Sequence, residues 1–377
     1  MSNSLTDSRV KRTLLVMLGV ASLTGCGQFL YVGIAPSTAT SPAAIAVYDI
    51  RDSGSTQQMT LKPSMALPAS VGNASAMVVV SDSLYVAGGS SVVAQYAISK
   101  MTGALTLSGT VPTGGPPQYM AATSKAIYVG SFPSNDLRVY SIAASGGALS
   151  NIQTLAASGI NSLHAESNLG KFVFSGHRAV GTATPQLCTH TIQANNTLGT
   201  TPSCVAIAGA PYSMQSFGGV LYVLFNAVVP PALGNTNWIS AWTINPNTGA
   251  LTQRGADLDI GAANRGRMAI STDGKRLFLP RQGGFDSVDT ANPLSISAVA
   301  FPTNQSQWCR LPPVVGFDIV VNPNGKAFYF TDTVGAVTGN IIGPRISAID
   351  LTGGNTLSAI VCDATGGIPQ SMAIFAQ

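Results

Sequence analysis

Charge is scarce in this sequence. Only 9% of its 377 residues are Asp, Glu, Lys or Arg, against about 25% in an average soluble protein. Glu166 is the only glutamate, and the chain has three histidines. The few Lys and Arg residues are not clustered, which excludes the basic footprint of a nucleic-acid-binding domain. We therefore expect a surface of neutral Ser, Thr, Asn, Gln and Gly.

Helical periodicity and metal-binding cysteine pairs are also missing. No segment keeps a convincing helical period over ten residues, so the chain is expected to be all-β. Four cysteines follow the N-terminal region, and none forms a CxxC pair: Cys188, Cys204, Cys309 and Cys362. This spacing argues against a metal site, and no cofactor is expected.

The first 28 residues have the layout of an export signal. A basic segment, with Arg9, Lys11 and Arg12, precedes about ten mostly apolar residues (13–22), too few for a membrane span of about 20. The run ends in Leu23-Thr24-Gly25-Cys26, which resembles the lipobox of bacterial lipoproteins. That resemblance implies cleavage after residue 25 and a lipid on Cys26; an ordinary secretory signal is the alternative.

Cleavage would change the charge and the location of the protein. It would remove three basic residues and Asp7 from the 19 basic and 15 acidic residues, leaving 16 and 14. Gly27 and Gln28 follow the cysteine, with no Asp in second place, which implies an outer-membrane lipoprotein of the cell envelope. An oxidising compartment also suits disulfide bonds.

One strand pattern recurs seven times with an aromatic residue at or near its centre. Successive copies lie about 43 to 56 residues apart and begin at residues 29, 84, 127, 171, 221, 277 and 328. Each is followed by further alternating strands with Gly and Asn turns, which is typical of hairpins. A repeat of this length predicts blades of a propeller.

A shorter strand precedes each aromatic strand and has its own marker residue. The markers are Met77, Met120, His164, Met214, Met268, Ile319 and Met372. The copy at 368–375 has no aromatic strand after it, and the copy at residue 29 has no marker strand before it. Pairing the two gives seven four-stranded blades in a ring closed by N- and C-terminal strands, without open sheet edges. The predicted domain spans residues 29–377.

These repeats resemble the lactonase-type propellers, the family of 6-phosphogluconolactonase and carboxymuconate cyclase, related to the YVTN repeats. The resemblance rests on the Leu-Tyr-Val-type strand, the Thr-Gly-Ala-Leu turn and the Asp273-Gly274-Lys275 turn. It implies a lactone-directed site around the central opening. Where family members have Gly-Pro-Arg-His, this chain has Ala210-Pro211-Tyr212-Ser213, and Asn226 and Ser162 replace a Glu and a His. These departures favour binding over inherited catalysis.

The fourth blade suggests a candidate acid–base pair. His164 and Glu166, two residues apart, would share a strand face that is apolar in nearly every sister blade. A carboxylate and an imidazole there could tune each other's pKa and act as a catalytic pair. A satisfied contact between blades is the alternative. His190 should lie far from the axis, so three-histidine metal binding is not expected.

Further candidates lie near strand ends that should reach one face. The predicted ligand-binding residues are His177, Arg178, Arg265, Arg267, Arg281 and Asp318. Arginine forks bind carboxylates and phosphates, whereas ordinary solvated charge is the alternative. Cys188 and Cys204 flank a turn centred on residue 196 and should form a disulfide; pairing of Cys309 with Cys362 follows only by elimination.

Two functions compete. The first is an envelope-anchored binding scaffold, held to the membrane by lipid, whose partner is a small anionic ligand, a glycan or an envelope protein. The second is a lactone hydrolase or cyclase that uses His164 and Glu166, with an arginine holding a carboxylate. Three extended residues from Cys26 to Phe29 reach about 10 Å, so we expect the body to lie against the bilayer, with Arg281 on the opposite face.

Overall fold

The computed structural model describes ten stretches longer than eight residues and four shorter ones. They are residues 27–35, 42–52, 57–131, 134–166, 170–180, 184–228, 235–261, 266–281, 284–291, 296–300, 315–333, 345–351, 356–362 and 368–376. Their regular secondary structure is all β-strand, as the sequence predicted. Within these ranges there is no helix long and apolar enough to cross a membrane. The N-terminal signal and Cys26 lie outside the described residues.

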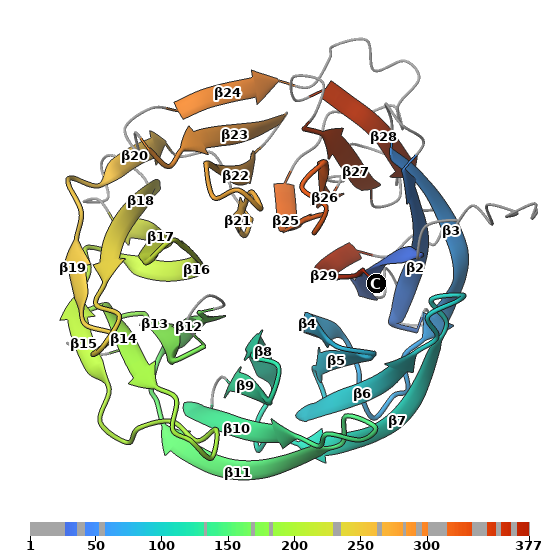
Figure 1. Ribbon diagram of the computed structural model, residues 1–377, viewed down its shortest axis with the longest axis horizontal. Helices are drawn as coiled ribbons and strands as arrows, with labels where there is room; N and C mark the ends of the chain where they lie inside the picture. The colour runs from blue at the N-terminus through green and yellow to red at the C-terminus, as the bar shows by residue number, and fades with distance from the viewer. Residues whose placement is uncertain are drawn as a thin grey trace, which may run out of the picture.

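Seven antiparallel sheets stand around a central axis as the blades of a propeller (Figure 1). Each blade is given from its inner strand outward. Blades 1 to 4 are β29 (Ile368–Phe375), β1 (Gln28–Ala35), β2 (Ala44–Asp52), β3 (Gln57–Ala66); β4 (Ala74–Val80), β5 (Ser83–Gly88), β6 (Val92–Ile98), β7 (Leu105–Pro112); β8 (Pro117–Ala122), β9 (Ala126–Ser131), β10 (Asp136–Ile142), β11 (Leu149–Ala156); and β12 (Ile160–Ala165), β13 (Phe172–His177), β14 (Gln186–Thr191), β15 (Ser203–Ala206).

The remaining three blades follow the same order with one addition. They are β16 (Ala210–Phe217), β17 (Val220–Val228), β18 (Asn235–Ile244), β19 (Leu251–Gln253); β21 (Ala269–Ile270), β22 (Arg276–Arg281), β23 (Gly284–Asp289), β24 (Ile296–Ala300); and β25 (Val315–Val321), β26 (Ala327–Thr333), β27 (Arg345–Asp350), β28 (Thr356–Cys362). In blade 5, β20 (Leu258–Gly261) also pairs with β18. The predicted four-stranded plan is confirmed, and this fifth strand was not predicted.

The ring closes by the predicted pairing of the two ends of the propeller. Strand β29 pairs antiparallel with β1, with Met372 opposite Val32 and Phe375 opposite Phe29. The innermost strand of blade 1 therefore comes from the C-terminal end and its other three strands from the N-terminal end. This pairing hides two sheet edges that would otherwise be open.

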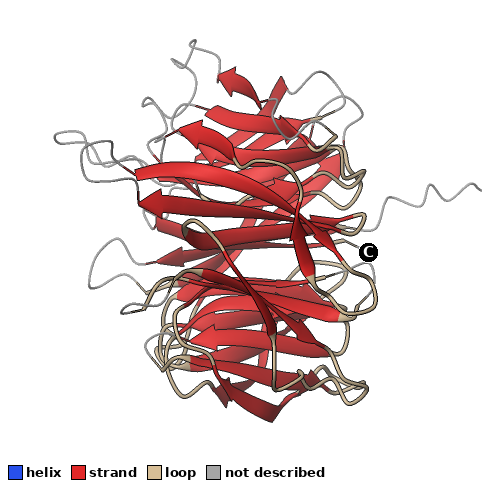
Figure 2. Cartoon of the chain, turned by 90° about the vertical axis from the view of Figure 1, so that its left-hand side faces the viewer, coloured by secondary structure: helices blue, strands red, loops and turns tan. Residues whose placement is uncertain are grey.

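The strands run across the thickness of the disc, which gives it two different faces (Figure 2). We call the face with the short connections from inner to second strands the turn face; these connections include residues 81–82, 123–125, 218–219, 272–275 and 323–326. The opposite face, where each second strand ends, is the loop face. Phe29 lies near the start of β1 and Arg281 at the end of the equivalent β22, so they lie on opposite faces.

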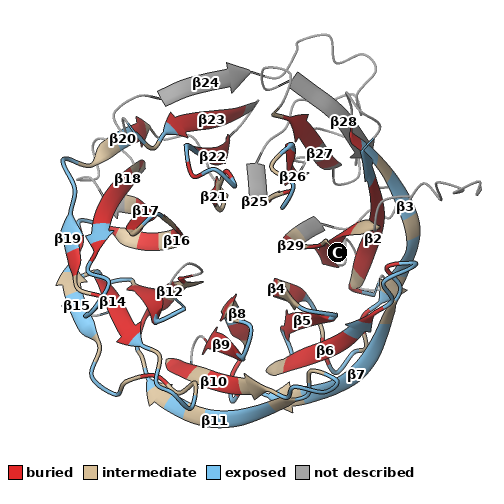
Figure 3. Cartoon of the chain, viewed as in Figure 1, coloured by how far each residue is buried: buried red, intermediate tan, exposed pale blue. Residues whose placement is uncertain are grey.

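The hydrophobic core lies between blades. The central aromatic residue of each second strand is nearly inaccessible to solvent, and the set is Tyr31, Tyr85, Tyr128, Phe174, Tyr222, Phe278 and Tyr329. In blade 5, Tyr222 packs with Met268 and Leu277 of blade 6, and the other junctions repeat this arrangement. Burial decreases outward, so the outer strands β3, β7 and β11 are mostly exposed (Figure 3).

The strand register corrects the marker position that was predicted for blade 4. In the inner strands of blades 2, 3, 5 and 1 the marker methionine is the second paired residue after a β-bulge, as in Met77 opposite Val86. By the same rule the marker of blade 4 is Leu163, opposite Ser175, and His164 follows it opposite Phe174. Because a one-residue shift turns a side chain to the other face of a strand, His164 points toward blade 5.

The predicted disulfide is confirmed. Cys188 and Cys204 stand directly opposite each other on β14 and β15, and their Cα atoms are 4.1 Å apart. Asn196 adopts a positive φ in the intervening turn. Cys309 and the side chain of Cys362 lie outside the described residues, so their pairing stays a prediction.

Candidate functional site

A cavity of about 280 Å³ occupies the central channel of the propeller. It is formed by inner strands of several blades together with Arg267 and Met268, which precede β21. Its polar lining includes Tyr119, His164, Tyr212, Gln215, Arg267 and Asp318. Concave sites with a few convergent polar groups are the usual places for small ligands.

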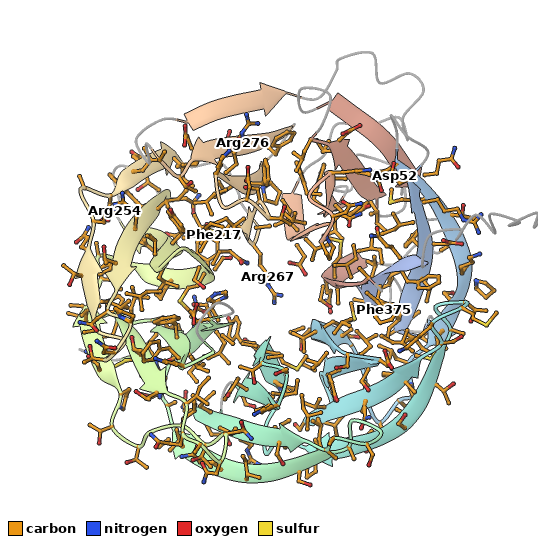
Figure 4. All side chains as sticks on the ribbon, in the orientation of Figure 1. Asp52, Phe217, Arg254, Arg267, Arg276 and Phe375 are labelled. Atoms are coloured by element: carbon orange, nitrogen blue, oxygen red, sulfur yellow. A yellow bond between two sulfur atoms is a disulfide. The ribbon has the colours of Figure 1, made fainter. Side chains whose placement is uncertain are left out.

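Arg267 supplies the positive charge of this cavity. Its side chain projects into the central opening (Figure 4) and is 34% exposed. One guanidinium nitrogen, Nη1, lies 3.7 Å from Oδ2 of Asp318 on blade 7, and the Asp318 side chain is only 5% exposed. This ion pair engages one end of the guanidinium group, and the remaining N–H donors are available to a ligand.

Asp318 is an anchored carboxylate rather than a free one. Its Oδ2 accepts the backbone N–H of Met372 at 2.7 Å, and its Oδ1 accepts the N–H of Ile319 at 3.0 Å. Burial raises the pKa of Asp318, and Arg267 and the two backbone donors oppose that shift. The carboxylate therefore connects blade 7 to blade 1 and orients Arg267.

A ring of polar contacts joins the inner strands around the channel. Each contact joins the residue just before a marker, or a neighbour of that residue, to the inner strand of the adjacent blade. From blade 1 onward the contacts are Ser371 Oγ to Ala74 O, Ser75 Oγ to Pro117 O, Tyr119 Oη to Asn161 Oδ1, Ser162 Oγ to Pro211 O, Met268 N to Ser213 Oγ, Arg267 to Asp318 and Met372 N to Asp318. This ring fixes the geometry of the channel wall.

His164 lines the cavity as a neutral imidazole. Its Nε2 is 2.8 Å from Ser216 Oγ of blade 5, and its ring stacks with that of Phe174. Burial lowers the pKa of His164 to about 4. At neutral pH it is therefore uncharged and already linked to the neighbouring blade.

Glu166 is placed differently from the prediction. It is 3% exposed and accepts the backbone N–H of Gly170 at 3.1 Å, which orders the connection between β12 and β13. It is not among the residues that line the cavity. The hydrogen bonds thus tie His164 to Ser216 and Glu166 to Gly170, and the predicted acid–base pairing of the two stays untested.

The other two histidines of blade 4 form a separate network. His177 Nδ1 donates to the carbonyl of Ser158 at 2.9 Å, so its Nε2 accepts from the hydroxyl of Ser175 at 2.8 Å. His190 Nε2 must then donate to the same Ser175 oxygen, at 2.9 Å. Burial lowers the pKa of both imidazoles, that of His190 to about 4. Among the described residues, no group of three or more His, Cys, Asp or Glu could hold a metal ion.

The structure describes only some of the predicted ligand-binding residues. His177 ends β13 and Arg178 follows it, so both lie at the loop face. Arg178 and Arg267 are both near enough to Tyr119 to oppose the rise in its pKa that burial causes. Arg265 and the side chain of Arg281 lie outside the described residues.

Comparison with known proteins agrees with the geometry. A family model described as Lactonase, 7-bladed beta-propeller matches residues 29–199. The chain is a seven-bladed β-propeller, and its N-terminal part matches the lactonase propeller family. A comparison with curated protein sequences gave no significant match.

Solved structures resemble this propeller over nearly its whole length. Proteins of Bacteroides fragilis and Bacteroides uniformis, both assigned as 6-phosphogluconolactonases, each give a TM-score of 0.63, at 18% and 16% identity, and the matches cover 94% and 93% of this chain and 99% of each of theirs. A protein of Lactobacillus plantarum gives 0.60 at 17% identity, with 93% and 99% covered. At such identities the likeness establishes the fold alone.

The positions that depart from the family signature lie around the cavity. Tyr212 and Ser213 line it, and the Tyr212 hydroxyl donates to Asn237 at 3.0 Å. Ser162 also lines it, while Asn226 pairs with Ala210 at the start of β16. The cavity lining is thus neutral at Ser162, Tyr212 and Ser213.

Tyr119 was missed from the sequence, although a simple signal identifies it together with the predicted residues Arg267 and Asp318. Tyr119, Ser213, Arg267 and Asp318 each stand immediately before a marker residue. A β-bulge beside this position accompanies its place on the cavity lining in blades 3, 5 and 7, and Ser162 takes the same place in blade 4. Reading the residue before each marker would have assembled this part of the site.

Proposed function

We propose that the protein is a lipid-anchored envelope protein whose central cavity binds a small anionic ligand. The observation that carries this proposal is the Arg267 side chain, which projects into the channel and makes one ion pair but no hydrogen bond to the described residues. A guanidinium has five N–H donors. Tyr119 and Tyr212 lie on the same lining, and because their hydroxyls donate to Asn161 and Asn237, their oxygens can accept hydrogen bonds from hydroxyl groups of a ligand.

The size of the cavity limits the ligand. At about 280 Å³ it lies near the lower end of ordinary small-molecule sites. A compact hydroxy acid or sugar acid fits this volume and presents both a carboxylate and hydroxyls. A peptide or glycan chain could contact only the rim.

Binding is tested by thermal stabilisation and calorimetry with gluconate, citrate and inorganic phosphate, and with glucose as the neutral control. We expect at least one anion to raise the melting temperature of the native protein. Arg267→Ala should abolish that effect, whereas Arg276→Ala, at the turn-face end of β22, should keep it. Equal responses of the two variants would refute the role of Arg267.

The lipid anchor is tested separately. Mass spectrometry of the protein extracted from membranes should show a diacylglycerol-modified Cys26 as the first residue. Cys26→Ser should release the protein from the membrane fraction. A mature N-terminus at any other residue would refute the anchor.

Lactone hydrolysis is the second candidate, favoured by the position of His164 in the same cavity as Arg267. A neutral imidazole could take a proton from water as the water attacks the lactone carbonyl, then return it to the ring oxygen as the C–O bond breaks. Its low pKa makes it a weak base. Ring opening of glucono-δ-lactone that is lost in His164→Gln would support this candidate, and equal rates in both proteins would exclude it.

A further inference from the structure

The turn face carries a ring of equivalently placed lysines. Each lies immediately before the first residue of a second strand, in the connection from the inner strand. The four are Lys125, Lys171, Lys275 and Lys326, on blades 3, 4, 6 and 7. In every case the lysine carbonyl accepts a backbone N–H from the end of the third strand, from Ile142, Ile192, Thr290 and Leu351 at 2.7 to 3.0 Å. The backbone therefore fixes all four on one face.

Their side chains are exposed to solvent. Lys125 and Lys171 take part in no ion pair with the described residues, and both are exposed. Lys275 pairs with Asp273 at 3.7 Å, where both side chains are more than half exposed, and Lys326 pairs with Asp52. Exposed pairs of this kind are weak, so these charges can exchange partners.

Lysines predominate on the turn face, where Arg51 and Arg276 also stand at strand ends, whereas the arginines near the cavity lie on the loop face. After residue 26 the chain has six lysines, and all but Lys62 on outer strand β3 lie in turn-face connections, Lys100 included. On the loop face the basic residues near the cavity are arginines, Arg178 and Arg267. Lysine is a compact, mobile charge, whereas arginine suits fixed, forked recognition. The division indicates two different kinds of partner.

The chain enters the propeller on this same face, beside an exposed apolar side chain. A Cβ added to Gly27 would lie 3.9 Å from the carbonyl oxygen of Lys100, and the Tyr31 hydroxyl donates to Gly103 at 3.0 Å. The connection between those two contacts holds Met101, which is 92% exposed. A flexible apolar side chain next to the point of anchoring is suited to insertion among lipid chains.

We propose that the turn face is a membrane-docking surface, on which the four ring lysines contact anionic lipid headgroups and Met101 enters the interface. The proposal rests on the lipid anchor at Cys26 for its location in the cell. Charge spread over four blades matches an extended planar surface, to which each Lys adds a comparable attraction. A protein partner would be recognised by a compact patch instead.

The test uses the full chain with Cys26→Ser, so that no acyl group contributes. Sedimentation is measured with vesicles of phosphatidylcholine alone and with 30% phosphatidylglycerol, at low and high salt. The lysine variant is Lys125→Glu/Lys171→Glu. Its matched control is Arg178→Glu/Arg254→Glu, which changes the net charge equally with two exposed residues that lie outside the turn-face connections.

We expect binding that requires phosphatidylglycerol, falls in high salt and weakens at least tenfold in the lysine variant, with less than a twofold change in the control. Met101→Ser should weaken it further without changing its salt dependence. Equal loss in the lysine and arginine variants, or binding independent of phosphatidylglycerol, would overturn the proposal. Lysine-dependent self-association in sedimentation velocity without vesicle binding would also overturn it.

Failure of the anchor gives a different result. If mass spectrometry finds no lipid on Cys26 but the lysine variant still loses vesicle binding, the docking surface stands and the anchor fails. If Cys26 is acylated and the lysines have no effect, the anchor stands and the docking surface fails.

Discussion

Asp318 accepts a hydrogen bond from the backbone N–H of Met372 across the junction where blade 7 meets the closing strand β29. The same carboxylate holds Arg267 at the cavity. A single side chain thus adds to the closure of the ring and orients the candidate ligand-binding cation. A substitution there is expected to affect stability and binding together.

Replacing Asp318 tests this coupling. Asp318→Ala leaves the Met372 N–H without its acceptor and Arg267 without its counter-charge, which should destabilise the protein by about 1–3 kcal/mol. Asp318→Asn keeps an acceptor oxygen and should lose less. Chemical denaturation measures both, and an unchanged midpoint in Asp318→Ala would contradict this account of ring closure.

The turn glycines differ in a testable way. Gly274 has a φ of +71°, and an added Cβ would lie 1.9 Å from the Phe217 ring; Gly146 has a φ of +72° with nothing within 4 Å. Gly146→Ala should therefore show only the left-handed penalty, about 1–2 kcal/mol. Gly274→Ala should lose at least about 1 kcal/mol more from overpacking. Thermal unfolding compares the two, and equal losses would argue against the contact.

The Cys188–Cys204 disulfide should stabilise the fourth blade. It closes a loop with a sequence separation of 16, for which restriction of the unfolded chain predicts about 3 kcal/mol. The double variant Cys188→Ala/Cys204→Ala should lose roughly that amount, and dithiothreitol should destabilise the native protein more than the double variant. A reductant effect that persists in the double variant would point to another bridge.

Stability should depend on pH through the buried histidines. Burial lowers the pKa of His190 from 6.5 to about 4, so between those values the folded protein binds fewer protons than the unfolded chain. The contribution of neutral His190 to the free energy of unfolding is fully present above pH 6.5. It is lost as the pH falls toward 4, by up to about 3 kcal/mol. In His190→Gln, denaturation at pH 7.5 and 4.5 should show a smaller difference than in the native protein. If both proteins showed the same difference, the proton taken up on unfolding would belong to a residue other than His190.

The architecture could be predicted from the sequence because each blade repeats the same local sequence pattern. An aromatic strand, a marker strand and Gly-containing turns recur with enough regularity to count the blades and to predict ring closure. The blade-5 addition β20 was not predicted, since four residues, Leu258–Gly261, give little periodic pattern.

The candidate site was less predictable because it depends on register. From the marker to the residue before the central aromatic of the next strand the spacing is seven residues in blade 2, Met77 to Leu84, but ten in blade 4, Leu163 to Val173. Because this connection is longer, the sequence-based prediction placed the marker one residue too late, at His164, and so assigned that side chain to the wrong face of the strand. Arg267 and Asp318 were found because charge is rare, whereas Tyr119 and Tyr212 carry no such signal. Their convergence depends on β-bulges that composition does not reveal.

Closure of the ring by β29 also sets an order of events during synthesis. Residues 28–35 leave the ribosome more than 330 residues before their partners at 368–375, and the hydrogen bonds between β1 and β29 cannot form until both are present. A nascent chain interrupted anywhere before residue 368 exposes one edge of β1 and lacks the Met372 N–H that Asp318 requires. We therefore expect a chain that lacks the closing strand to be cleaved by proteases more readily than the finished propeller, because its ring is open.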